Sequence, residues 1–338
     1  MNLSRFPRIA LGHLPTPLER MDRMRALLGP ECPTLYVKRD DCTGLATGGN
    51  KTRKLEFLMG EALVQGANAV ITFGAIQSNH ARQTAAAAAK LGFYCDLILV
   101  DMVLREGEAY RRSGNVLLDG ILGARIHGVG ADQSVAKLQE VTAEHARAGR
   151  KAYVVPMGGS NAVGSLGYVA AFDEIATQAR ALDLNVDAIM FATSSGGTQA
   201  GLMVGAALAG SATRIMGVNV YKDNVADVAG TVHALALETM QMLGGELNDV
   251  TAKLHVIDGY TGEGYGIPTD EMLEAALIAA QTEGLLLDPV YSGKAMAGLI
   301  GHIRRGKFTR EQTVVFLHTG GTAALSAYVE AFTPIFSN

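Results

Sequence analysis

The stretch 48–55 reads Gly-Gly-Asn-Lys-Thr-Arg-Lys-Leu, and it places Lys51 where a glycine-rich turn enters a helix. The helical pattern continues from Lys54 to Leu63. A lone lysine at a turn is most often a solvated surface residue. A phosphate loop of the nucleotide-binding kind needs a glycine directly before the lysine, and Asn50 occupies that position. The stretch therefore indicates either a surface lysine or an amine held in place for chemistry.

One chemistry that needs a well-placed lysine is the Schiff base with pyridoxal phosphate (PLP). It requires three further groups elsewhere in the chain: a cradle for the phosphate, a partner for the pyridine nitrogen, and side chains that stack on or clamp the substrate. The sequence offers candidates for all three, so PLP is the cofactor that we expect.

Length and composition set limits on the kind of protein. The 338 residues favour two domains, and 48% hydrophobic against 18% charged residues indicates a globular chain. A net charge of −4 gives no long-range attraction for nucleic acid or anionic lipid. Neither the three cysteines nor the eight histidines show metal-ligand spacing, so we expect no metal. With no signal core or membrane-length apolar run, we expect a cytoplasmic protein without nucleic-acid or membrane partners.

Apolar strands alternate with helical segments along most of the chain. We expect strands at 34–39, 69–73, 95–100, 124–127, 153–156, 188–192, 215–220 and 313–318. We expect helices at 81–91, 110–122, 134–148, 162–182, from 199 onward, at 224–243 and 271–283, and after 319–322. This pattern is typical of the α/β class, with mainly parallel sheets covered on both faces. Such folds bind ligands outside the carboxyl ends of their strands, where the polar, glycine-rich turns lie.

A candidate phosphate cradle follows the strand at 188–192 and opens a helix; it consists of Ser194, Ser195, Gly196, Gly197 and Thr198. Glycines let the backbone approach a ligand, and the N–H groups and dipole of a helix start favour an anion. A plain strand-to-helix turn would use the same residue types. Phosphate binding is only slightly favoured by this stretch alone.

A second polar turn, with Ser78, Asn79 and His80, has the same placement after the strand at 69–73. Its helix start would suit a substrate carboxylate, and Asn79 could donate to a phenolate oxygen of a cofactor ring. Helix N-caps of serine or asparagine are common for structural reasons alone. His80, in the same turn, is a candidate for the substrate side, but it could equally be a solvated residue of the first helical turn.

Two loop tyrosines complete the set of candidates. Tyr291 and Ser292 lie between a proline and a glycine in an apolar neighbourhood, and Tyr265 lies between two glycines. A packed core tyrosine is the ordinary interpretation. The hydroxyl of Ser292 or of Thr319 could face a pyridine nitrogen.

Together these stretches resemble fold type II (tryptophan synthase β-type) PLP enzymes, and among them the 1-aminocyclopropane-1-carboxylate (ACC) deaminase and D-cysteine desulfhydrase family. The resemblance runs from Arg5 to about Tyr328. Its motifs are Pro-Thr-Pro-Leu at 15–18, Lys-Arg-Asp-Asp at 38–41, Gly-Gly-Asn-Lys at 48–51, Gln-Ser-Asn-His at 77–80, Gly-Gly-Ser-Asn at 158–161, Asp-Pro-Val-Tyr at 288–291 and His-Thr-Gly-Gly at 318–321.

The resemblance implies two open, mainly parallel twisted sheets flanked by helices. It implies a smaller domain at 52–158 inserted in a larger PLP-binding domain made of 1–51 and 159–338, and usually a homodimer. The partner is a small amino-acid substrate. The roles that it implies are the Schiff base for Lys51, the ring oxygen for Asn79, the phosphate for Ser194 to Thr198, and the substrate side for Ser78, Tyr265 and Tyr291.

The residues at the ring nitrogen bear on the reaction. ACC deaminases of this family carry a glutamate after the tyrosine matching Tyr291, whereas this chain has Ser292 there, and Thr319 where a leucine is typical. A hydroxyl leaves the ring closer to neutral because no charge offsets a pyridinium. A weaker electron sink suffices when the β-substituent leaves easily. The sequence therefore favours β-elimination of a sulfur group over cyclopropane opening.

Two substrates compete for this interpretation: L-cysteate, which would lose sulfite, and D-cysteine, which would lose sulfide. The stretch 39–54 resembles most the L-cysteate sulfo-lyases of marine bacteria. A non-catalytic amino-acid or nucleotide-binding protein on the same fold would keep the glycine loops. It would have no reason to keep the lysine, a ring-nitrogen partner and both tyrosines together.

Overall fold

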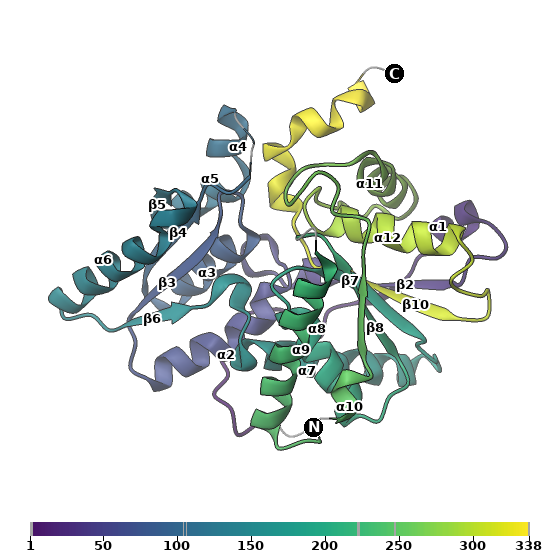
Figure 1. Cartoon of the computed structure of the whole chain (residues 1–338), viewed down its shortest axis with the longest axis horizontal. Coiled ribbons are helices and arrows are strands. Elements are labelled where there is room, and N and C mark those ends of the chain that lie inside the picture. Colours follow the sequence, from purple (N-terminus) through teal and green to yellow (C-terminus); the bar gives the residue numbers. More distant parts are fainter. Residues whose placement is uncertain (1–2, 104, 106, 222–223, 247, 337–338) are drawn as a thin grey trace.

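The protein has two mainly parallel sheets side by side, each covered by helices (Figure 1). The computed structural model describes residues 3–103, 105, 107–221, 224–246 and 248–336. One sheet has four strands in the order β5-β4-β3-β6, and the other has six in the order β1-β2-β10-β7-β8-β9. The expected fold class, α/β with two mainly parallel sheets flanked by helices, is confirmed.

The four-stranded sheet is parallel throughout. Its strands are β3 (Ala69–Ala75), β4 (Tyr94–Val100), β5 (Arg125–Val129) and β6 (Ala152–Val155). Helices α2 (Lys51–Val64) and α3 (Asn79–Leu91) pack on one face, and α6 (Ser134–Arg147) packs on the other. The alanines of α3 are buried from residue 85 to residue 88, because small side chains let the helix lie close to the sheet.

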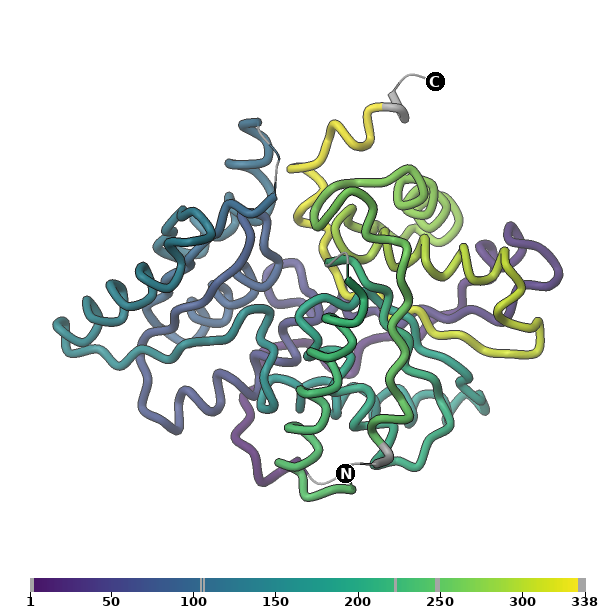
Figure 2. The backbone as a smooth tube through the Cα atoms, viewed as in Figure 1, coloured from purple at the N-terminus to yellow at the C-terminus, as the bar shows by residue number. Residues whose placement is uncertain are grey.

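The six-stranded sheet takes strands from both ends of the chain. These are β1 (Leu18–Arg20), β2 (Thr34–Lys38), β7 (Ala188–Thr193), β8 (Arg214–Asn219), β9 (Leu254–Ile257) and β10 (Thr313–Leu317). Strand β1 is antiparallel to β2, and the other pairs are parallel. The purple and yellow segments of Figure 2 lie side by side because β2 pairs with β10.

Helices cover both faces of this larger sheet. One face carries α1 (Asp22–Leu28), α11 (Asp270–Glu283) and α12 (Ser292–Arg304), and the other carries α7 (Ala162–Ala181), α8 (Gly197–Leu208) and α9 (Val225–Leu243). The remaining helices are α4 (Glu108–Arg112), α5 (Gly114–Ile121) and α10 (Asn248–Thr251). Among the described residues, no helix is both long and apolar enough to cross a bilayer.

Most expected elements are present within a few residues, and three differences have physical causes. The helix expected at 110–122 is two helices, α4 and α5. The helical conformation is interrupted at Ser113, and Gly114 takes a positive φ of 59°. The final helix was expected to be α-helical and is instead two 3₁₀ segments, Thr322–Ala327 and Val329–Phe336. Helix α12 was missed, since its three glycines lower its helix propensity while packing buries ten of its thirteen residues.

The four-stranded sheet lies wholly within the smaller domain proposed at 52–158. The proposed boundary at residue 52 falls in the first turn of α2, and that turn is fixed to the larger unit. A Cβ on Gly167 of α7 would lie 2.4 Å from the Arg53 carbonyl oxygen, so the two helices cross at close range. We retain 52–158, and 1–51 with 159–338, as proposed domains.

A buried ion network fixes the start of α2. Arg53 binds Asp40 through two hydrogen bonds of 2.8 Å and also pairs with Glu174 of α7 at 2.8 Å. Lys38 of β2 pairs with the same Glu174 at 2.5 Å. Burial pushes the pKa of Glu174 up, but Arg53 and Lys38 outweigh it and lower the pKa to about 2. Charged side chains from β2, α2 and α7 are therefore joined in one network.

Replacing Arg53 by methionine should destabilise the apoprotein by about 3–5 kcal/mol, because Asp40 would keep a buried charge without its cationic partner and Glu174 would keep only Lys38. Urea unfolding of the apoprotein measures this. The control is Arg304→Met, which breaks a half-exposed pair with Glu274 and should cost about 0–1 kcal/mol. Equal losses in the two variants would contradict the role assigned to the network.

Candidate active site

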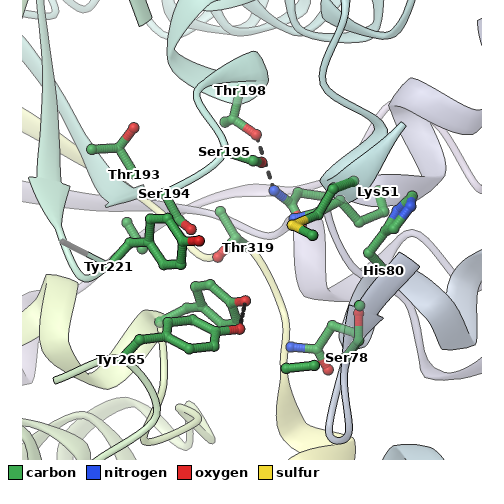
Figure 3. A pocket seen from close by; sticks show the side chains of 18 of the residues that line it. Lys51, Ser78, His80, Thr193, Ser194, Ser195, Thr198, Tyr221, Tyr265 and Thr319 are labelled. Atoms are coloured by element: carbon green, nitrogen blue, oxygen red, sulfur yellow. Dashed lines mark hydrogen bonds between the residues drawn. The ribbon is translucent and has the colours of Figure 1, made fainter. Parts of the chain in front are cut away.

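A cavity opens at the carboxyl ends of the strands, between the two sheets (Figure 3). Together with the open solvent at its mouth, it holds about 910 Å³ of empty space. Its described lining residues are Asn50, Lys51, Phe73, Gly74, Ala75, Ser78, Asn79, His80, Met102, Met157, Gly158, Ala192, Thr193, Ser194, Ser195, Gly196, Thr198, Tyr221, Tyr265, Tyr291, Thr319 and Gly320. Eleven of the thirteen predicted site residues are among them; Gly197 and Ser292 are not.

Lys51 is the first residue of α2 and projects into this cavity. The turn before it needs glycine: Gly48 and Gly49 have φ values of 74° and 130°. A Cβ on Gly48 would lie 2.0 Å from the Asp41 carbonyl oxygen. The Lys51 Nζ donates to Asn50 Oδ1 at 3.1 Å and lies 5.9 Å from the ring centre of Tyr291. Of the two initial interpretations, the surface lysine is therefore wrong.

The electrostatics of Lys51 favour a reactive amine. Surrounding protein atoms desolvate the ammonium and lower its pKa from 10.5 to about 8, with Arg82 adding to the effect and Asp288 opposing it. At pH 7 about a tenth of the amine is then neutral, against about 0.03% for an ordinary lysine. A neutral amine is the form that attacks a carbonyl group.

The predicted phosphate cradle lies at the start of α8. Gly196 takes a φ of 85°, and the helix begins at Gly197, whose N–H donates to Ser160 Oγ at 3.2 Å. Ser195 Oγ lies 2.8 Å from the same Ser160 hydroxyl. Thr198 Oγ1 accepts a bond of 3.0 Å from the Asn50 side chain, which links the cradle to the lysine turn (Figure 3). The unpaired N–H groups of a helix start form a site for an anion.

Lys54 is a buried lysine beneath this cradle. Its Nζ donates to the Gly158 carbonyl at 3.0 Å and to Ser160 Oγ at 3.1 Å. A Cβ on Gly197 would lie 2.9 Å from this Nζ. Burial and the neighbouring Lys51 hold the pKa of Lys54 well below its usual value, and an anion in the cradle would offset both effects. The sequence did not predict this position of Lys54 beneath the cradle. Lys54 lies three residues after Lys51, and residues three apart share a helix face.

The wall from the smaller sheet carries Ser78, Asn79 and His80 at the start of α3. Ser78 is the N-cap, and its Oγ accepts the Ala81 N–H at 3.1 Å. Asn79 Oδ1 accepts from Arg82 at 3.3 Å, and Arg82 also donates to the Gly48 carbonyl at 2.6 Å. Arg82 is fully buried and was not predicted; it ties the Asn79 side chain to the lysine turn.

His80 is buried, so its interpretation as a solvated residue is wrong. Its Nε2 lies 2.8 Å from Thr72 Oγ1, which donates to the Val155 carbonyl at 2.9 Å. Burial is the main cause that holds the pKa of His80 well below 6.5, so the imidazole is neutral at pH 7. Its Nδ1 is buried and has no hydrogen-bond partner among the described residues.

Three tyrosines from three loops form the opposite wall. The Tyr265 and Tyr291 hydroxyls are hydrogen bonded to each other, and their rings meet edge-on at 5.8 Å. Tyr221, which follows β8 and was not predicted, packs edge-on against Tyr265 at 5.3 Å (Figure 3). One hydroxyl of the pair donates its proton to the other, so the second hydroxyl keeps its own proton for a hydrogen bond to a ligand.

Only one of the two proposed ring-nitrogen partners faces the cavity. Ser292 Oγ accepts the Asp288 N–H at 2.8 Å, donates to Asp288 Oδ1 at 2.6 Å and does not line the cavity. The Asp288 carboxylate is itself buried and also accepts the N–H groups of residues 290–292. Thr319 lies on the cavity wall, which leaves its hydroxyl as the candidate donor.

Comparison with known proteins supplies the family context. The family model described as "Pyridoxal-phosphate dependent enzyme" matches residues 9–320. The chain in a crystal structure of an ACC deaminase homologue shares 37% sequence identity with this chain at a TM-score of 0.87. The match covers 98% of this chain and 97% of that one. A threonine deaminase from T.th. shares 18% identity at a TM-score of 0.65, covering 90% and 92% of the two chains. The processed form of threonine deaminase isoform 2 from Solanum lycopersicum shares 16% identity at a TM-score of 0.66, covering 98% and 85%.

The cavity fits PLP, the cofactor that these comparisons indicate. It combines an anion cradle, a lysine of lowered pKa and hydroxyl and amide donors on opposite walls. Thr193 Oγ1 on the cavity wall is buried without a hydrogen-bond partner among the described residues, as expected at a site built for a polar ligand. No group of three or more metal-binding side chains occurs in the described part of the chain.

The pKa of Lys51 leads to a prediction about cofactor loading. Below pH 8 the rate of PLP uptake by the apoprotein should rise with pH, as Lys51 loses its proton, and it should level off above about pH 8. Stopped-flow growth of the visible absorbance band measures the rate. The variant Lys51→Arg is the control and should develop no band. A rate that keeps rising about tenfold per pH unit to pH 10 would contradict the lowered pKa.

Proposed function

The chain belongs to the pyridoxal-phosphate dependent enzyme family, and we propose that it is a carbon–sulfur lyase that converts L-cysteate to pyruvate, sulfite and ammonia. In this proposal Lys51 holds PLP, residues 194–198 with Lys54 hold its phosphate, Asn79 meets the ring oxygen and Thr319 faces the ring nitrogen. Ser78, His80, Tyr265 and Tyr291 line the substrate side.

The observation that carries the proposal is the polarity of the cavity. Besides the cradle, its described lining residues include three serine or threonine hydroxyls (Ser78, Thr193 and Thr319), three tyrosines and two asparagines, and none of them is Asp or Glu. Cysteate brings two anionic groups, a carboxylate and a sulfonate, and a buried anion is very costly without donors. The thiol of cysteine is small and needs no such set.

The partner of the ring nitrogen supports elimination over ACC deamination. The relative at 37% identity is an ACC deaminase homologue, so ACC is the natural competing substrate. The Thr319 hydroxyl can donate a hydrogen bond to a neutral pyridine nitrogen but cannot hold a pyridinium by charge. Asp288, the buried carboxylate of this region, is engaged by Ser292 and three backbone N–H groups. Sulfite leaves readily, so a weak electron sink is sufficient for it.

Each residue has a defined part in the reaction. PLP, when bound, supplies an electron sink for charge that develops at the substrate Cα. Lys51 Nζ, with its pKa lowered to about 8, can take the Cα proton when it is not joined to the cofactor. The C–S bond then breaks with its electron pair on sulfite, and water completes the conversion to pyruvate and ammonia without any oxidant. The start of α3 at Ser78 and Asn79 would bind the substrate carboxylate.

His80 can have only a smaller role in substrate binding than the sequence predicts. Its Nε2–H is directed to Thr72, whose own proton goes to the Val155 carbonyl, so the neutral ring offers only an Nδ1 lone pair. The sulfonate donors should therefore come from the tyrosine wall, not from His80. The tyrosine hydroxyls keep their protons, because burial, the largest cause, raises the pKa of both Tyr265 and Tyr291.

The proposal also includes two expectations about the protein as a whole. The three cysteines are free thiols, which suits a reduced cytoplasm. The family resemblance implies a homodimer, and light scattering of the purified protein would measure its mass in solution.

The substrate is tested by measuring sulfite and sulfide release in parallel from L-cysteate and D-cysteine. We expect kcat/KM for L-cysteate to exceed that for D-cysteine, with sulfite and pyruvate formed in equal amounts. ACC should give no turnover. A wide preference for D-cysteine would identify a desulfhydrase, the alternative left open by the sequence, and would overturn the assignment.

Removing a hydroxyl from the tyrosine wall tests how the sulfonate is held. Tyr265→Phe and Tyr291→Phe should each lower kcat/KM for L-cysteate by about tenfold or more, since a hydrogen bond to a charged group is worth about 1.5–3 kcal/mol, and should affect D-cysteine less. The matched control is Tyr260→Phe, because the Tyr260 hydroxyl bonds Arg305 outside the cavity. Equal losses for both substrates would mean that the hydroxyls serve another purpose, such as proton donation.

A further inference from the structure

Lys294 is a buried lysine that does not line the cavity. It is the third residue of α12 and has no exposed surface. Its Nζ donates to the Thr261 carbonyl at 2.5 Å and to the Gly264 carbonyl at 3.1 Å. Both carbonyls belong to the loop 258–269, which joins β9 to α11. The Gly264 carbonyl is part of the peptide bond to Tyr265, so Lys294 holds the peptide plane from which that side chain projects.

The loop has few other hydrogen bonds to its backbone among the described residues. Gly262, Gly264 and Gly266 have φ values of 69°, 155° and 76°, a region open to glycine but strained for other residues. Glycines also lose the most conformational freedom when they are ordered. Inside the loop, the described backbone hydrogen bond is Ile267 N–H to the Gly264 carbonyl, at 3.3 Å, and Thr261 Oγ1 donates a long bond of 3.4 Å to the Asn219 carbonyl of β8. An ammonium that binds two carbonyls supplies the order that the loop sequence lacks.

The charge on Lys294 has a local counter-charge. Asp288, which lies in the turn before α12, favours the protonated form of Lys294, while burial, the larger effect, lowers its pKa from 10.5 to about 8. The Asp288 carboxylate is fixed by the N–H groups of residues 290–292. Below about pH 8 the lysine therefore makes charge-assisted hydrogen bonds, which are stronger than those of a neutral amine.

Helix α12 thus places both tyrosines. Tyr291 is the residue at its N-terminus, and Tyr265 is held from the same helix through Lys294. We propose that Lys294 is a positioning residue that sets the Tyr265–Tyr291 hydroxyl pair at the cavity and thereby governs substrate binding. The inference rests on the proposed substrate role of the tyrosine pair, but not on which sulfur amino acid is the substrate.

The test compares wild type, Lys294→Met and Lys294→Arg as PLP-loaded enzymes. Lys294→Met removes the donors, so hydrogen exchange of amides 261–266 should become at least about tenfold faster. KM should rise at least about tenfold, with a smaller fall in kcat. The substrate for this assay is whichever of L-cysteate and D-cysteine the wild-type enzyme converts. PLP content and the visible band should stay at wild-type values, because the cradle and Lys51 belong to other elements.

The control variant is Lys253→Met, which removes another lysine–carbonyl contact, to Ser211, away from the cavity. It should change neither loop exchange nor KM. Lys294→Arg keeps its charge at all pH values. Its loop protection should approach that of wild type, and its KM should stay flat above pH 8, where wild-type KM rises.

Unchanged loop exchange in Lys294→Met would overturn the inference. Faster exchange with unchanged KM would overturn it as well, because the loop would then not act on the substrate. If Lys294→Met does not fold into a PLP-binding protein, Lys294→Gln, which removes the ammonium and shortens the side chain, replaces it, with the same expected changes in loop exchange and KM. A wild type without sulfur-lyase activity would instead refute the proposed function, while the loop exchange of the variants would still be measurable.

Discussion

The bidentate pair between Arg53 and Asp40 is the interaction on which the site depends. Both side chains are fully buried, and they fix the first turn of α2 against the turn that follows β2, where Asp40 also accepts a hydrogen bond from Tyr168 of α7. Lys51 lies two residues before Arg53, so the same contacts set where its amine enters the cavity. The positive φ angles of the preceding glycines and the Arg82 bond to Gly48 complete this placement. The lysine is therefore held by the larger sheet unit while it faces a wall of the smaller one.

Basic side chains outnumber carboxylates in and behind the cavity wall. Lys51, Lys54 and Lys294 are desolvated and have lowered pKa values, while Asp288 is the carboxylate that acts on the first and third of them. Such an arrangement is unfavourable in an empty site and becomes favourable when anions bind. A cofactor phosphate and a substrate with two anionic groups would supply that charge. This balance links the PLP site to the preference proposed for cysteate.

Sequence patterns predicted the parts of the fold that depend on local order. Apolar strands such as Ala188–Thr193 and the alanine-rich α3 are strong local signals, and the turns after the strands identified part of the cavity lining. Residues that act from behind the wall were missed, because Lys54, Arg82 and Lys294 gain their partners only from tertiary contacts. Ser292 or Thr319 was predicted to face the ring nitrogen, a role that stays untested, yet the Ser292 proton is directed to Asp288. A motif shows that a hydroxyl is present but not where its hydrogen points.

The central claim is that Lys51, among several buried lysines near the cavity, carries the cofactor. Borohydride reduction of the PLP-loaded protein, followed by peptide mapping with fragmentation mass spectrometry, tests it directly. The account predicts one pyridoxyl group per chain, attached to Lys51 Nζ, and loss of the visible band on reduction. Attachment to Lys54 or Lys294, or a loaded protein in which borohydride fixes no cofactor, would contradict it.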